Sequence, residues 1–137
     1  MIESSNARSS LCGLREWLFS HELLCVRVQS NLGHEQYIEL TSDELRVEIT
    51  LDRGEWSIGL GLLGMDHTYH PDEWEAWFDH VPLPWHLSDL DHQVAFIRNR
   101  WLAAAALARS DVPAAESELE AIGLDWVESR FGWRPSG

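Results

Sequence analysis

The chain has 137 residues, of which 45% are hydrophobic and eight are tryptophan, and its formal charge at pH 7 is −13. This apolar content excludes a disordered acidic tail, and the length fits a single globular domain spanning residues 1–137. Such a strong negative charge disfavours nucleic acid and anionic membrane as partners, and we expect neither.

The first predicted helix begins near Ser10, a residue type that caps helices well. Leu11, Leu14 and Leu18 follow at helical spacing, and the helix is expected to end near residues 21–24. Residues 1–9 and 134–137 are predicted to be flexible. A weak strand is predicted over Leu24–Gln29.

The two cysteines, Cys12 and Cys25, are too few for a disulfide framework. Cys12 falls within the predicted helix and Cys25 within an apolar run, so both are expected in the core as free thiols of a reducing cytosol. The polar start of the chain lacks the pattern of a secretory signal, which also favours a cytoplasmic location.

The β pattern is clearest in the middle of the chain, beginning with a short strand at Tyr37–Leu40. Apolar and polar residues then alternate through Leu45–Asp52 and again through Trp56–Leu62, with a tight Gly-containing connection between them. This pattern predicts an antiparallel hairpin over residues 45–62. Its buried residues are predicted to be Val47, Ile49, Trp56 and Ile58. Gly59 and Gly61 lie on the opposite face, where they either weaken the strand or allow close packing.

Three helices are predicted after the hairpin. The first begins at Pro71 and carries Trp74, Trp77, Phe78 and Val81 on one face, until Pro82 and Pro84 end it. The second is the longest, about residues 89–108, with Ser88 and Asp91 as a capping pair and Trp101 on its apolar face. The third begins near Asp111 and Pro113 and is expected to close at Gly123.

Strands that precede a run of helices favour an α+β fold. We therefore expect an N-terminal helix and an antiparallel sheet of three or four strands, followed by three helices packed on one face of that sheet.

The run Leu45–Leu62, LRVEITLDRGEWSIGLGL, resembles the central hairpin of small bacterial α+β proteins that act as immunity proteins of secreted or injected toxins. This resemblance implies a cytosolic, non-enzymatic inhibitor that blocks its cognate toxin. It implies no particular functional residues, because the binding surfaces of immunity proteins differ from one toxin to the next.

Residues 66–91 contain seven carboxylates, four histidines and three tryptophans, but no lysine or arginine. An acidic segment of this kind suits a positively charged partner, such as the basic active-site cleft of a toxin. Trp85 is flanked by Pro84 and His86 in an extended linker, outside any helical pattern, so it is either a binding anchor or a lid on the core. The predicted partner-binding residues are Asp66, Asp72, Glu73, Glu75, Asp79, Trp85, His86, Asp89 and Asp91.

Other chemistry has weaker support in the sequence. His67, His70 and His80, with Asp66 and Asp79, are metal-binding residue types, but their spacing is not that of a compact zinc site, so we expect no metal and no cofactor. Glu73 and Asp79 are a possible acid–base pair, although acidic residues at the start of a helix explain them equally well. The alternative to an inhibitor is a small-molecule-binding or enzymatic domain with a pocket between sheet and helices.

Overall fold

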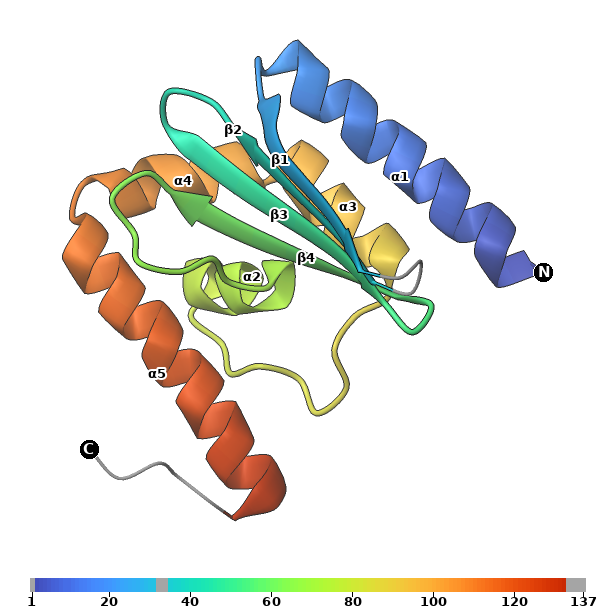
Figure 1. The fold of residues 1–137 in the computed structure, drawn as a ribbon. Coiled ribbons are helices and arrows are strands. Elements are labelled where there is room, and N and C mark those ends of the chain that lie inside the picture. The colour runs from blue at the N-terminus through green and yellow to red at the C-terminus, as the bar shows by residue number, and fades with distance from the viewer. Residues whose placement is uncertain (1, 32–34, 133–137) are drawn as a thin grey trace.

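The computed structural model describes residues 2–31 and 35–132 and has the predicted α+β arrangement (Figure 1). Helix α1 (Ile2–Ser20) precedes the strands β1 (Leu24–Asn31), β2 (Glu35–Thr41), β3 (Leu45–Asp52) and β4 (Glu55–Leu62). Helices α2 (Pro71–Asp79), α3 (Leu90–Asn99), α4 (Trp101–Arg109) and α5 (Val112–Phe131) follow. Residues 2–9, which we expected to be flexible, lie within α1. The prediction for residues 134–137 lies outside the described residues.

The four strands form an antiparallel sheet in the order β1-β2-β3-β4. In the predicted hairpin, Leu45 pairs with Leu62 and Ile49 pairs with Ile58. The two-residue turn places both Arg53 and Gly54 at positive φ, as the twist of a tight hairpin requires. The hairpin is confirmed, and Ile49 and Ile58 are buried as predicted.

The core lies between the sheet and the helices, and all five described helices contribute buried side chains to it together with β2, β3 and β4. Val47 is buried there as predicted, whereas Trp56, near the turn, is only partly buried. Trp101 is central, with its ring centroid 5.9 Å from that of Trp17 and 6.3 Å from that of Trp74. The prediction that the helical tryptophans belong to the core is confirmed.

Gly59 and Gly61 allow the segment before α2 to cross the sheet closely. A Cβ atom on Gly59 would lie 2.3 Å from Oγ1 of Thr68, which is far inside van der Waals contact. The next residue, Tyr69, exchanges two backbone hydrogen bonds of 2.8 Å with Leu60 on the free edge of β4. This pairing fixes where α2 begins.

Three predicted helix boundaries are wrong. The first helix, predicted to begin at a cap near Ser10, begins at Ile2. The predicted helix over residues 89–108 is broken at Arg100, whose φ of −133° separates α3 from α4. The side chain of Arg100 makes ion pairs with α2, so tertiary contacts accompany the break. Gly123 does not end the last helix, because α5 continues through it to Phe131.

The thiols of Cys12 and Cys25 are both exposed, so the prediction of two core cysteines is wrong. Cys12 lies on an exposed position of α1. Cys25 lies on β1, the edge strand of the sheet, where its apolar neighbours Leu24 and Val26 are also exposed. Within residues 2–31 and 35–132, no helix combines the length and apolar character needed to cross a membrane.

Candidate functional site

The first turn of α2 is fixed by a reciprocal cap. The Nδ1 atom of His70 accepts a hydrogen bond of 3.0 Å from the backbone N–H of Asp72, and the carboxylate of Glu73 accepts one of 3.4 Å from the backbone N–H of His70. Burial lowers the pKa of His70, although the nearby Asp72 opposes this effect. A neutral imidazole is the form that can accept at Nδ1.

Asp72 belongs to the interior of the site. Its side chain is only 4% exposed, and Oδ2 accepts a hydrogen bond of 2.6 Å from the backbone N–H of Ser88, while Oδ1 accepts one from the hydroxyl of the same residue. Asp72 therefore fastens the linker after α2 to the first turn of that helix. This burial is inconsistent with its predicted place on a partner-binding surface.

The cap of α3 also differs from the sequence prediction. Asp89, rather than Ser88, occupies the cap position, where its Oδ1 accepts a hydrogen bond of 2.9 Å from the backbone N–H of His92. Asp91 does not complete a capping pair; its carboxylate accepts a hydrogen bond from the hydroxyl of Ser10 on α1. The predicted pair of Ser88 and Asp91 is therefore wrong, because each residue bonds to a different helix.

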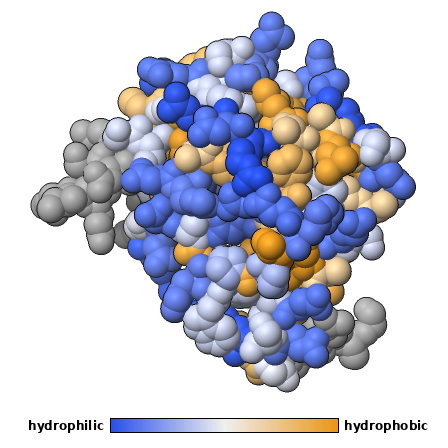
Figure 2. All heavy atoms as spheres, turned by 180° about the vertical axis from the view of Figure 1, so that it is seen from behind, coloured by the Kyte–Doolittle hydropathy of each residue, from blue (hydrophilic) through white to orange (hydrophobic). Residues whose placement is uncertain are grey.

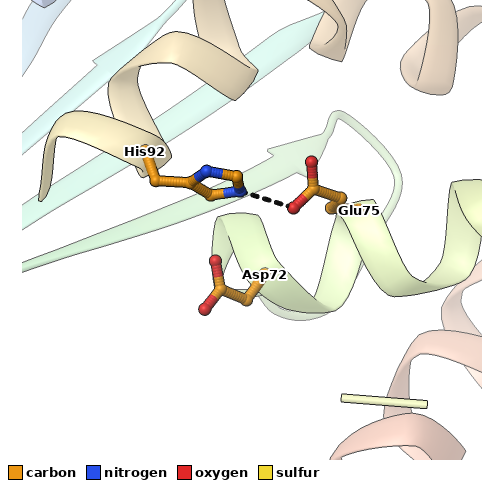
Figure 3. Close-up of side chains that lie close together, drawn as sticks. All are labelled: Asp72, Glu75 and His92. Atoms are coloured by element: carbon orange, nitrogen blue, oxygen red, sulfur yellow. Dashed lines mark hydrogen bonds and ion pairs between the residues drawn. The ribbon is translucent and has the colours of Figure 1, made fainter. Parts of the chain in front are cut away.

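Glu75 and Asp79 are neutralised by partners from outside the acidic segment. The Nε2 atom of His92 lies 2.7 Å from Oε1 of Glu75 (Figure 3), and Arg100 donates to Oε2 of Glu75 at 3.0 Å and to Oδ2 of Asp79 at 3.1 Å. The hydrogen bond from Arg100 holds the pKa of Asp79 below its ordinary value, and the hydrogen bond that His92 makes to Glu75 raises the pKa of His92. The acidic segment thus has fewer free charges than its sequence indicates.

Asp72, Glu75 and His92 each offer a metal-ligating atom, and these three atoms lie within 4.8 Å of one another (Figure 3). Carboxylates and an imidazole are ligands that zinc accepts. However, both oxygens of Asp72 already bind Ser88, and Glu75 already binds His92 and Arg100, so a metal would have to displace these protein contacts. The arrangement is better explained as a fastening of α2 to α3. The residues considered from the sequence, including His67, His70 and His80, do not form such a group among the described residues.

The linker of residues 81–87, which we call the anchor loop, projects below α2 in Figure 1. The Nε1 atom of Trp126 donates a hydrogen bond of 2.9 Å to the carbonyl oxygen of Pro84, and Arg130 donates one of 2.7 Å to the carbonyl oxygen of Trp85. The guanidinium of Arg130 also lies 5.0 Å from the ring centroid of Trp85. Two hydrogen bonds to consecutive carbonyls therefore fix the backbone of the loop against α5.

The side chains of the anchor loop remain largely open to solvent. Trp85 is 54% exposed, so it is not a lid on the core. Val81, Leu87 and His86 are exposed too. The carboxylates of Asp66 and Asp89, near the two ends of the acidic segment, are also at the surface.

A groove of about 630 Å³ lies between α5, the start of α2 and the anchor loop. Its polar side chains are His67, Thr68, Tyr69, His70, Glu73 and Glu120, and its apolar side chains are Leu83, Leu87, Leu124, Trp126 and Val127. The hydroxyl of Tyr69 donates to Glu116 at 2.7 Å and to Glu120 at 3.2 Å, and burial together with these carboxylates raises its pKa. Tyr69 therefore remains a protonated donor at neutral pH.

The basic partners of this region are residues that were not predicted from the sequence. Arg100 and His92 come from α3 and the residue that follows it, and Arg130 comes from the end of α5. No local pattern links them to residues 66–91, because the pairs are separated by 17 to 45 positions in the chain.

Comparisons of this chain with protein-family models, with curated proteins and with solved structures found no match.

Proposed function

We propose that this protein is a stoichiometric inhibitor that binds a basic partner protein through the anchor loop and the acidic residues around it. The observation that carries the proposal is Trp85, which is 54% exposed although its carbonyl oxygen is fixed to Arg130 at 2.7 Å. An exposed aromatic side chain on a backbone that is already ordered loses little entropy on binding.

The charge of the chain supports a basic partner. The formal charge is −13, and Asp66 and Asp89 are exposed close to the ends of the segment that includes the anchor loop. Such charges speed the encounter with a positive surface, while the apolar contact slows dissociation. The resemblance of the hairpin to immunity proteins makes a cognate toxin with a basic active-site cleft the partner that we propose.

Affinity capture from the native host, followed by activity measurements on the captured protein, tests this function. We expect the wild-type chain to capture a basic protein and to abolish its activity at one equivalent. Trp85→Ala should lose the captured protein, whereas Leu102→Ala, which truncates an exposed apolar residue on α4, should retain it. A captured protein that stays fully active at several equivalents would contradict the inhibitor function.

A further inference from the structure

The groove between α2 and α5 has the dimensions of a ligand site. Its volume of about 630 Å³ lies within the range of roughly 300–1,000 Å³ that is usual for small-molecule pockets. Leu83 and Leu87 of the anchor loop, with Leu124 and Val127 of α5, give it apolar walls. Five of its lining residues belong to α5, so the site rests on a rigid element.

The carboxyl group of Glu73 is placed against the wall of this groove. Its Oε1 accepts a hydrogen bond from the backbone N–H of His70, and its Oε2 faces α5 at Gly123, where a Cβ atom would lie only 3.0 Å away. Glycine at this position therefore gives the carboxyl group room. Among the described residues, Oε2 has no hydrogen-bond donor.

Among the described residues, the carboxyl groups of the groove have no lysine or arginine as a partner. Glu120, which also lines it, accepts only the hydroxyl of Tyr69 among the described residues. No lysine or arginine occurs among the described side chains that line the groove. A ligand can therefore supply a cation to these carboxyl groups, in contrast to Glu75 and Asp79, which pair with Arg100.

We propose that this groove binds an organic cation in which an apolar body ends in an ammonium or guanidinium group. The cation lies at Glu73 and Glu120, and the apolar body lies against Leu83, Leu87 and Leu124. A free small amine has this chemistry, and so does a lysine or arginine side chain of a polypeptide. The proposal is independent of the inhibitor function, since it concerns the isolated chain.

Protonation of Glu73 gives this site a measurable signature. Burial is the main cause that raises the pKa of Glu73 to about 7, with a smaller contribution from the charge of Asp72, whereas the hydrogen bond from His70 lowers it. The titratable groups that face Glu73 are Asp72 on its own helix, His67, Tyr69 and His70 before it, and Glu120 on α5. Because a bound cation favours the ionised carboxylate, binding at pH 7 should release protons, and affinity should rise between pH 6 and pH 8.

The test compares 4-phenylbutylamine with its neutral analogue 4-phenyl-1-butanol on the whole chain, by amide chemical shifts and calorimetry. We expect the amine to shift residues 67–70 and 120–127 and to bind about tenfold more tightly than the alcohol. Glu73→Gln should remove that preference and the pH dependence. Glu55→Gln, an exposed carboxylate in the hairpin, is the matched control and should change neither.

Two further arms complete the experiment. Leu124→Ser, at a surface position of α5, should weaken the amine without unfolding the chain. A short peptide with one lysine distinguishes the two sources of the cation. Tighter binding of the peptide than of the amine assigns the cation to a polypeptide side chain, and tighter binding of the amine assigns it to a free small molecule. Equal affinity for amine and alcohol, or no shift in these residues up to about 10 mM of either probe, would overturn the proposal.

Discussion

The side chain of Glu73 caps the start of α2, but its ionisation at high pH destabilises the folded state. Its pKa rises from an ordinary value of 4.5 to about 7, chiefly through burial, although its carboxyl group caps the N–H of His70. A carboxyl group whose pKa is raised by folding binds more protons in the folded state. Its ionisation therefore reduces stability as pH rises from about 4.5 to 7.

Glu73→Gln should accordingly stabilise the protein at pH 8 by about 1–2 kcal/mol and have little effect at pH 5. Glutamine retains the carbonyl oxygen that accepts from His70, so the cap is preserved. Chemical denaturation at the two pH values measures the difference. Equal effects at both would show that Glu73 is ionised throughout.

The titration of His92 is linked to stability through a pKa that is raised for a different reason, a hydrogen bond to a carboxylate. The hydrogen bond to Glu75 raises its pKa, so the stabilisation is fully present below pH 6.5 and is lost as pH rises through the folded-state pKa. Glu75→Gln should return the pKa of His92 toward 6.5, and Glu55→Gln should leave it unchanged. NMR titration of the imidazole measures the pKa of His92 in each variant. A pKa that is unaffected by Glu75→Gln would mean that the pair does not form in solution.

At the scale of elements, the hairpin and the segment that crosses it form one packed unit. Thr68 lies over Gly59, and its hydroxyl donates a hydrogen bond of 3.0 Å to Glu48 on β3. Gly59→Ala would drive a methyl group into Thr68, because the two atoms would lie 2.3 Å apart.

Gly59→Ala should therefore cost about 1–3 kcal/mol of stability, the usual range for overpacking. The same substitution should cost much less in a Thr68→Gly background, since the obstructing side chain is then absent. Thermal or urea unfolding of the four proteins in this cycle measures the coupling. Additive effects would show that Thr68 does not obstruct this position.

The elements that could be predicted from the sequence are those whose cause is local. Residues 45–62 contain a complete alternating pattern and its turn, so the hairpin could be predicted with its register. The break at Arg100 could not, because it coincides with ion pairs to Glu75 and Asp79 on another helix. Likewise, Gly123 was predicted to end a helix, but in the fold it lies within α5 and faces the carboxyl group of Glu73.

Only part of the candidate site could be predicted, because several of its contacts join residues that are far apart in the chain. Trp85 falls outside every periodic pattern, which correctly indicated that it does not belong to a helix face. The burial of Asp72 depends on Ser88, 16 positions away, and the loop geometry depends on Arg130, 45 positions away. Contacts at such separations leave no pattern in a single sequence.

At the scale of the whole molecule, the acidic residues do not contribute equally to the negative charge that a partner meets. Figure 2 shows hydrophilic residues over much of the rear face, with apolar residues gathered mainly toward the upper right. The formal charge of −13 remains large, but Glu75 and Asp79 already have internal partners. Long-range attraction to a partner therefore depends on exposed carboxylates such as Asp66 and Asp89.

Asp66→Asn combined with Asp89→Asn should slow association with the partner several-fold at low salt and have less effect at about 0.5 M salt. Asparagine preserves the cap of α3, so the melting temperature should not change. Stopped-flow or surface kinetics at the two ionic strengths measures the effect. A loss of affinity that is independent of salt would assign these residues a different role.

The dissociation rate of the partner complex tests the central claim most directly. Trp85→Ala should speed dissociation by about 30-fold or more, which corresponds to roughly 2 kcal/mol for an interface anchor. Its melting temperature should stay close to that of the wild type, because Trp85 is 54% exposed and the hydrogen bonds that fix the loop go to the carbonyl oxygens of Pro84 and Trp85. If Trp85→Ala instead lowers the melting temperature and leaves dissociation unchanged, Trp85 supports the fold and the anchor loop is not the binding site.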